Sequence, residues 1–416
     1  MQEPDIQVGL MSCREITFTL YGKYHVVAPK GNPTPAKKIV DGPQRAYMAE
    51  GKICWNGQSF SELLFFPTSD PEKDVFELKN VLIGKEFHWQ QEEDQRFQGT
   101  LHLIIEEDEI TAINIISTER YLTSVISSEM SATASLEFLK AHAVISRSWL
   151  LAQLNAPKND EQSCCSESDE EVVRWYNRSA HQHYDVCADD HCQRYQGVTR
   201  VTSDVAKQAV EQTRGKILVY NGEICDARFS KCCGGKTEVF STCWEDKDYA
   251  YLSSVDDPYC GMADEQILSQ VMVNYDQSTT DFYRWTVRYS QQELHDLITK
   301  KTGINLGLIL DMEPLARGTS GRIYRLKITG SQRSLIIGKE LEIRKTLSET
   351  HLFSSAFTIE KQGSDRVPEA FVLHGAGWGH GVGLCQIGAA VMGEQGFKYE
   401  DILLHYYRGA KIITSY

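Results

Sequence analysis

One carboxylate, Glu129, stands at the joint between two apolar stretches of helix-forming sequence, at 117–130 and 134–154. Lys140 and Arg147 follow in the second stretch, two helical turns apart and therefore on one face. A lone carboxyl group in apolar surroundings is suited to general acid catalysis. The plainer interpretation is a solvated Glu129, with Lys140 and Arg147 as ordinary ion-pair partners.

A second group of reactive side chains gathers within 181–193, where the chain offers two thiols and three imidazoles. Protein-bound zinc takes Cys sulfur and His nitrogen in a tetrahedral arrangement. We therefore expect a structural zinc site made of Cys187, His191, Cys192 and either His181 or His183. If all four ligands are protein groups, the ion has no open position. The alternative is a pair of buried thiols beside surface histidines.

A Gly-rich loop at 375–383 carries Trp378 and His380. It has neither the Lys-Ser/Thr ending of a phosphate-binding loop nor the spacing of a dinucleotide fingerprint. Glycines let the backbone approach a ligand closely, and an indole offers a flat face to a sugar ring. A buried Trp in a tight turn explains the same residues equally well. The run Ser230-Lys231-Cys232-Cys233 before Gly234-Gly235 poses the same choice.

The strands and helices that must position these groups indicate an α+β fold. Alternating apolar residues and Gly/Pro/Asn clusters predict strands over 5–112, whereas 117–154 has helical periodicity. We expect a central apolar helical hairpin packed against β-rich regions, with a β-rich N-terminal domain at 1–116 and a second region at 117–416. The second region divides into a hairpin (117–154), an acidic insertion loop (155–180), a His/Cys segment with strands (181–264), a mixed α/β insertion (265–370), and a Gly-rich loop with C-terminal helices (371–416).

Composition narrows the class of protein further. The 416 residues carry a net charge of −14, which argues against binding nucleic acid phosphates. No apolar run is long enough for a transmembrane helix. The opening residues Met1–Asp5 have neither the basic nor the apolar region of a signal peptide. Either a signal was trimmed, or the protein is not secreted by that route. The 12 cysteines are spaced too irregularly for a disulfide scaffold, so most are expected to be buried thiols.

Five blocks of the chain resemble, in order, the SpoIID/LytB family of stage II sporulation protein D and the amidase-enhancer proteins. Residues 121–130 resemble its "YL-x-x-V-x-x-x-E-M" block, and 139–148 its "LKAQAVAARTY" helix, with His142 in place of Gln. Residues 187–195 resemble "D-x-C-x-x-x-x-x-CQ-x-Y", 229–237 resemble "F-HSSSGG-x-T", and 377–386 resemble "GWGHGVGMSQ". Residues 1–116 match only loosely.

The resemblance implies a lytic transglycosylase that cleaves the MurNAc–GlcNAc bond of peptidoglycan and leaves 1,6-anhydro-MurNAc ends. Glu129 falls on the family's catalytic acid, and the family's zinc site supports His181, Cys187, His191 and Cys192 as ligands. The positions that fall on the family's substrate groove are Lys140, Arg147, Gln193, Tyr195, Ser230, Trp378, His380 and Gln386. The cysteines at 232 and 233 depart from the family's Ser-rich run.

Two other functions compete with this one. A non-catalytic glycan-binding protein, or an enhancer of a cell-wall amidase, would tolerate Glu129→Gln. A zinc hydrolase with its metal at 181–192 would need an open coordination position. For the transglycosylase and for the enhancer, the expected partners are glycan strands, intact or stripped of their stem peptides, and the expected location is the cell envelope.

Overall fold

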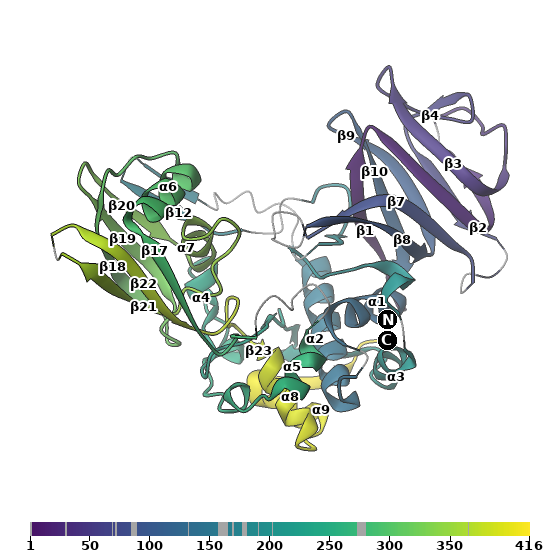
Figure 1. Cartoon of the computed structure of the whole chain (residues 1–416). Coiled ribbons are helices and arrows are strands. Elements are labelled where there is room, and N and C mark those ends of the chain that lie inside the picture. The colour runs from purple at the N-terminus through teal and green to yellow at the C-terminus, as the bar shows by residue number, and fades with distance from the viewer. Residues whose placement is uncertain are drawn as a thin grey trace. The chain divides into compact units, whose positions relative to one another are not determined.

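The computed structural model of this α+β protein describes residues 2–29, 31–68, 70, 73–84, 90–131, 133–156, 165–168, 170–176, 181–189, 191–201, 203–272, 280–364 and 366–416 (Figure 1). The chain forms two compact units, each built from separate stretches of sequence. The first contains Met1–Ala132, His181–Gly215 and Thr414–Tyr416, and the second contains Thr133–Ala180 and Lys216–Ile413.

The first unit is dominated by an 11-stranded sheet. Its strands alternate buried and exposed residues, as at Ile16, Phe18 and Leu20 of β2, because one face packs into the core. The strands are β1 (Asp5–Cys13), β2 (Glu15–Val27), β3 (Ile39–Ala49), β4 (Lys52–Trp55), β5 (Gln58–Phe60), β6 (Leu63–Pro67), β7 (Val75–Ile83), β8 (Gln91–Gln98), β9 (Thr100–Glu106), β10 (Glu109–Ser117) and β13 (Val186–Cys187). Their order is β13-β1-β10-β9-β6-β2-β3-β4-β5, with β7 pairing β2 and β8.

The short strand β13 extends this sheet beyond β1. It runs parallel to β1 and pairs Val8 with Val186 and Gly9 with Cys187. Gly9 is required there because a Cβ atom would lie 2.6 Å from the ring of Tyr184. Residues 184–187 are therefore fixed against the N-terminal strand.

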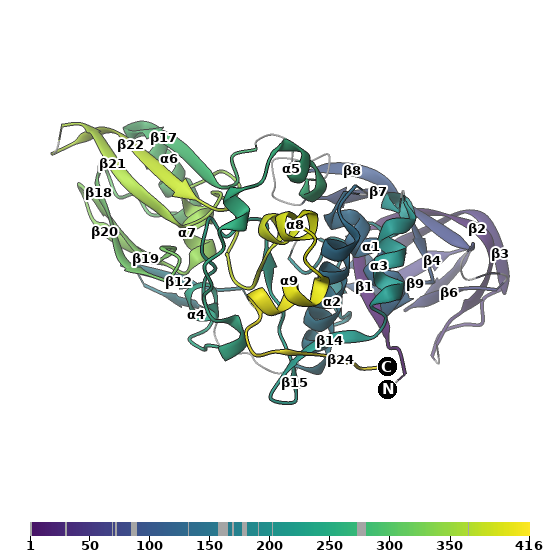
Figure 2. The same cartoon turned by 90° about the horizontal axis from the view of Figure 1, so that it is seen from below.

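Helix α1 (Thr118–Glu129) continues directly from β10, and η2 (Gly197–Arg200) and α3 (Asp204–Gln212) complete the first unit. Both ends of the chain lie beside α1 (Figures 1 and 2). Glu119 connects them, because its backbone N–H donates to Glu3 Oε1 (3.0 Å) and its Oε1 accepts from Tyr416 Oη (2.5 Å).

The second unit is built in part around α2 (Leu136–Asn155), which is buried on most sides. Ser135 caps it by accepting from Phe138 N. Figure 2 shows α8 (Gln386–Glu394) and α9 (Tyr399–Tyr406) next to α2, which both contact. Smaller elements complete this part: β14 (Lys216–Tyr220), β15 (Glu223–Ile224), β16 (Phe229–Ser230), α4 (Phe240–Cys243), η3 (Ala250–Leu252), η4 (Tyr259–Gly261), α5 (Glu265–Val271), β23 (Leu384–Cys385) and β24 (Lys411–Thr414).

Two further sheets of the second unit share an apolar core that includes Trp285, Leu294, Leu326 and Phe371. One sheet has the order β11-β12-β20-β19-β18 and the other β17-β22-β21. Their elements, with two helices, are β11 (Cys165–Glu167), β12 (Glu171–Arg174), β17 (Arg284–Ser290), α6 (Gln291–Thr302), β18 (Ile309–Arg317), β19 (Ile323–Gly330), β20 (Ser334–Gly338), α7 (Glu340–Thr346), β21 (Phe357–Gly363) and β22 (Pro368–Ala376).

The two helices expected as a hairpin form as helices but belong to different units, α1 to the first and α2 to the second. Much of the expected acidic loop at 155–180, including Cys164, lies outside the described residues. Among the helices that the structure describes, none combines the length and apolar character needed to cross a membrane.

Candidate functional site

Glu129 is the last residue of α1 and is half-buried. Tyr121, Leu122, Val125 and Ile126 recur at helical spacing and are fully buried, so they fix that face of α1 against the core of the first unit. The buried face therefore holds the helix, while Glu129 at its end keeps part of its surface exposed.

A backbone amide meets the Glu129 side chain. Arg194 N donates to Glu129 Oε1 at 3.1 Å. The neighbouring residues also bind α1, since Gln196 N donates to Ser128 Oγ (3.3 Å) and Tyr121 Oη donates to Gln193 Oε1 (3.2 Å). Residues 193–196 thus follow α1 and deliver a hydrogen-bond donor to its C-terminal carboxylate.

Tyr195 anchors this segment in the interior. Its hydroxyl donates to Asn114 Oδ1 at 2.5 Å, and its ring stacks on Tyr121 with centroids 5.1 Å apart. Burial raises the pKa of both phenols, so both stay neutral donors. Gln193 and Tyr195 are each 1% exposed. In this conformation they can support the site but cannot touch a ligand on the surface.

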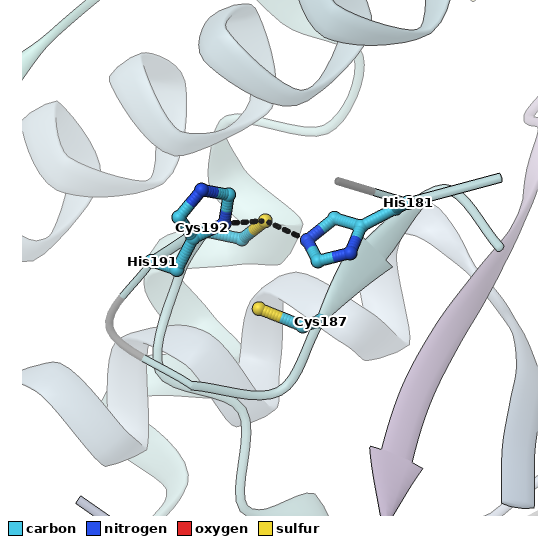
Figure 3. A group of neighbouring side chains, drawn as sticks. All are labelled: His181, Cys187, His191 and Cys192. Carbon is cyan, nitrogen blue, oxygen red and sulfur yellow. Dashed lines mark hydrogen bonds between the residues drawn. The ribbon is translucent and has the colours of Figure 1, made fainter. Parts of the chain in front are cut away.

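The four residues expected as metal ligands come together in the first unit, directly before the Gln193–Gln196 segment. The side chains of His181, Cys187, His191 and Cys192 point toward one another (Figure 3), and their ligand atoms lie within 4.8 Å of each other. Cys192 Sγ is 3.4 Å from His181 Nε2 and 3.6 Å from His191 Nδ1. His183 is outside this group, and its Nε2 lies 3.9 Å from Glu106 Oε1.

The chemistry of this set suits a zinc ion. A tetrahedral site with Zn–S near 2.3 Å and Zn–N near 2.0 Å places S and N ligands about 3.5 Å apart. The two S–N distances above match that spacing. Hydrogen bonds from Cys192, His181 and His191 outweigh burial and lower the pKa of Cys187 to about 2, so the cluster already favours a thiolate. Two thiols and two imidazoles fill four positions, as a structural site requires.

Lys140 and Arg147 both lie on α2, in the second unit. Lys140 Nζ pairs with Glu137 Oε1 at 2.8 Å. Arg147 has no exposed surface and donates to the carbonyl oxygen of Lys216 at 3.0 Å. The Lys140 side chain keeps 14% of its surface exposed, whereas Arg147 holds β14 against α2.

Gln386, the first residue of α8, is also buried in the second unit and contacts α2 through a histidine. Its Nε2 donates to His142 Nε2 at 3.0 Å, which leaves the imidazole proton on Nδ1, 3.2 Å from Ser146 Oγ. Burial, with Lys231 nearby, lowers the pKa of His142 to about 3. His142, the neutral partner of Gln386, therefore occupies a position at which the family pattern has Gln.

The Gly-rich loop presents Trp378 and His380 as half-buried side chains. Trp378 stacks on Phe353, with centroids 4.6 Å apart, so one face of the indole is already covered. Val382 N donates to His380 Nδ1 at 3.0 Å. Burial, followed by Arg228 and Arg322, holds the His380 pKa well below its usual range. His380 is therefore a neutral imidazole with its proton on Nε2.

Ser230 lies at the end of β16, beside this loop. Its side chain is 7% exposed, and its Oγ has no hydrogen-bond partner among the residues that the structure describes. A Cβ atom at Gly379 would lie 3.2 Å from Ser230 Cβ, which leaves little room for a side chain at Gly379.

The loop owes its shape to Arg322, which the sequence did not single out. This fully buried guanidinium donates through Nε to Gly379 O (3.1 Å) and through Nη1 to Cys233 O (3.1 Å). Gly381 has a φ of 76°, and a Cβ atom there would lie 2.4 Å from Arg322 Cζ. The role of Arg194 could not be predicted either, because it donates through its backbone N–H, and almost every residue type has one.

Comparison with known proteins assigns two regions of the chain. Residues 106–220 match the family described as Stage II sporulation protein, SpoIID. This region contains α1, α2 and the His/Cys cluster. Residues 238–383 match a domain of unknown function, DUF8618. That match contains the elements from β17 to β22, with α6 and α7, and ends in the Gly-rich loop.

Three relatives illustrate the similarity over most of the chain. An uncharacterized protein of Brachyspira hyodysenteriae is 27% identical over 321 residues, which are 76% of this chain and 72% of the relative. Stage II sporulation protein D of Bacillus amyloliquefaciens is 27% identical over 303 residues, covering 72% of this chain and 75% of the relative. The amidase enhancer of Bacillus subtilis is 26% identical over 320 residues, 71% of this chain but 40% of that protein.

Proposed function

The chain belongs to the SpoIID/LytB family, and on that basis we propose that it is a peptidoglycan lytic transglycosylase. The family indicates a cell-wall-related protein that works outside the cytoplasm. The observation that carries the specific activity is the half-buried Glu129 at the end of α1, whose carboxylate is oriented by Arg194 N.

In the proposed reaction Glu129 acts first as an acid and then as a base. It protonates the oxygen between MurNAc and GlcNAc while the bond from that oxygen to MurNAc C1 breaks. The resulting carboxylate accepts the proton of the MurNAc C6 hydroxyl, whose oxygen bonds to C1. The product carries a 1,6-anhydro ring and Glu129 regains its proton. Because the nucleophile belongs to the sugar, no second carboxylate is needed, unlike in ordinary glycosidases.

We assign a structural zinc ion to His181, Cys187, His191 and Cys192. When bound, it would supply a fixed cross-link and no reactive position. Arg194, two residues beyond Cys192, donates its backbone N–H to Glu129. The ligands therefore support the carboxylate indirectly, by holding the segment that contains its donor.

Residues of the second unit are proposed to contact the glycan or to support those that do. Lys140, Trp378 and His380 are half-buried and are the proposed contacts with the glycan. Ser230 Oγ is buried and has no hydrogen-bond partner among the described residues, so Ser230 is proposed to shape the loop beside it and not to touch the glycan. The buried Arg147 and Gln386, like Gln193 and Tyr195 of the first unit, act as positioning residues.

The similarity to an amidase enhancer favours a second candidate, a glycan-binding protein that stimulates a cell-wall amidase without chemistry of its own. The two candidates differ in their dependence on Glu129. An enhancer needs the surface but not the acid, whereas a transglycosylase needs both.

The test is product analysis by mass spectrometry, with intact peptidoglycan and with glycan strands stripped of stem peptides as substrates. Wild type should release anhydro-muropeptides or anhydro-disaccharides, and Glu129→Gln should release neither. Glu109→Gln, which changes another half-buried acid of the first unit, should behave as wild type. Reducing-end products would contradict the proposed reaction. No product from either form, with amidase stimulation retained in Glu129→Gln, would favour the enhancer.

A further inference from the structure

A second group of thiols lies in the interior of the second unit, away from the His/Cys cluster. Cys232 and Cys233 follow β16, Cys260 lies in η4 and Cys385 precedes α8, and Asp257 joins them. These five side chains are between 0 and 3% exposed. All four cysteines are free thiols. Segments distant in sequence thus place sulfur and oxygen ligands at one buried point.

The spacing of these atoms matches a single tetrahedral ion. The ligand atoms of Cys233, Asp257, Cys260 and Cys385 all lie within 4.8 Å of one another. Cys233 Sγ is 3.6 Å from Cys260 Sγ and 3.2 Å from Asp257 Oδ2. Around a zinc ion, two sulfurs are expected about 3.8 Å apart, and a sulfur and a carboxylate oxygen about 3.5 Å apart.

The surroundings of these atoms are those of a metal site. Cys385 Sγ accepts from Cys233 N (3.2 Å) and from Gly388 N (3.5 Å) at the first turn of α8, where a negative sulfur is favoured. Asp257 Oδ1 accepts from Tyr259 N (3.0 Å), while Tyr406 Oη donates to Oδ2 (3.1 Å). Outer hydrogen bonds of this kind orient metal ligands.

Charge balance supports the same conclusion. One carboxyl group and several thiols, each able to lose a proton, are buried together at this point. A divalent cation would favour their deprotonated forms, because those are the forms that bind it. Cys232, Cys233 and Cys385 are separate from the His/Cys cluster at 181–192, which belongs to the first unit.

We propose that Cys233, Asp257, Cys260 and Cys385 bind a zinc ion at a second, structural site. The four protein ligands complete the coordination shell, so the ion does no chemistry. It links the segment after β16 with η4 and α8. Cys232 also exchanges backbone hydrogen bonds with Trp378, at 3.1 and 2.8 Å, so the link extends to the Gly-rich loop.

The direct test is the zinc content of the full chain after purification with zinc and removal of loosely bound metal. Cys260→Ser, Cys385→Ser and Asp257→Asn should each lose about one equivalent relative to wild type. Cys225→Ser, which removes another fully buried thiol of the second unit, should lose none. Equal zinc in wild type and the Cys260 and Cys385 variants would overturn the proposal. Loss with Cys232→Ser but not with Asp257→Asn would overturn the assignment of the fourth ligand.

A measurement on wild type covers the case in which a variant fails to fold. The thiols of the native zinc-loaded chain are alkylated before and after treatment with a strong chelator, and each cysteine is quantified by mass spectrometry. Protection of Cys233, Cys260 and Cys385 should be lost on chelation, while Cys225 stays protected. Unchanged protection, or a disulfide between Cys233 and Cys260 in the freshly purified chain, would refute the site. Cobalt bound to Cys192→Ser should still show thiolate-to-metal absorption, which separates this site from the one at 181–192.

Discussion

The hydrogen bond between Arg194 N and Glu129 allows the structural and chemical roles of this carboxylate to be separated. Glu129→Gln keeps an oxygen acceptor for the amide at 3.1 Å but has no acidic proton to transfer. Glu129→Ala removes both. Arg194 is 8% exposed, so its N–H would then lose its partner in a largely buried position. We expect both variants to lose activity but only Glu129→Ala to lose stability.

The size of the difference follows from the cost of an unsatisfied buried donor, about 1–3 kcal/mol. For a unit of this size, that cost lowers the melting temperature by about 2–12 °C. The loss of a general acid should reduce the rate by about 10²–10⁴-fold in either variant. Hydrogen exchange adds a local measure, since the Arg194 amide should exchange about 5–150-fold faster in Glu129→Ala than in Glu129→Gln.

The assay combines calorimetry, hydrogen exchange read by mass spectrometry, and anhydro-product release. Glu109→Ala and Glu109→Gln serve as the matched pair, because Glu109 is half-buried in the same unit. Equal stability of the two Glu129 variants, with equal exchange at Arg194, would refute the positioning argument. Full activity of Glu129→Gln would refute the chemical one.

Three further predictions concern the buried His142, the buried Arg322 and the His/Cys cluster. His142 has a folded pKa of about 3 against 6.5 unfolded, so the unfolded chain binds the proton first and stability falls as the pH drops below 6.5. Urea denaturation at pH 7 and pH 5 measures the effect. Between these pH values the free energy of unfolding of His142→Gln should fall by about 2 kcal/mol less than that of wild type, and an equal fall would contradict this. Arg322→Lys should lower the free energy of unfolding by about 3 kcal/mol, because one amine cannot replace the several N–H donors of the guanidinium. The control is Arg325→Lys at a partly exposed position, which should lower it by under about 1 kcal/mol. Cys192→Ser should speed amide exchange over 193–196, with Cys54→Ser as the control; unchanged exchange would argue against the link to Glu129.

The sequence was sufficient where the determinants are local. Helices at 117–130 and 134–154 follow from apolar periodicity, and Glu129 lies at the end of the first as expected. The ligands at 181–192 could be proposed from spacing, because twelve residues of chain hold them together. The choice of His181 over His183 as the group's fourth member required the structure, since both are within reach along the chain.

Contacts between residues far apart in the chain could not be predicted from the sequence. Cys233, Cys260 and Cys385 converge from positions up to 152 residues apart, and only the Cys232-Cys233 doublet drew attention. The same holds for Arg322, whose role depends on backbone carbonyls of the Gly-rich loop. Burial of Arg147 and Tyr195 was also unexpected, because the family resemblance placed them on the substrate groove, whereas internal partners satisfy them.

The pairing of β13 with β1 has a consequence for the order in which the protein is made. Gln7 N binds the Asp185 carboxylate across a separation of 178 residues, and closing a chain of that length costs about 4.6 kcal/mol of entropy in its length-dependent part. During synthesis α1 is complete well before residues 185–196 leave the ribosome. The Glu129 carboxylate therefore has no Arg194 amide to bind at that stage. Their hydrogen bond can form only after the intervening part of the second unit has emerged.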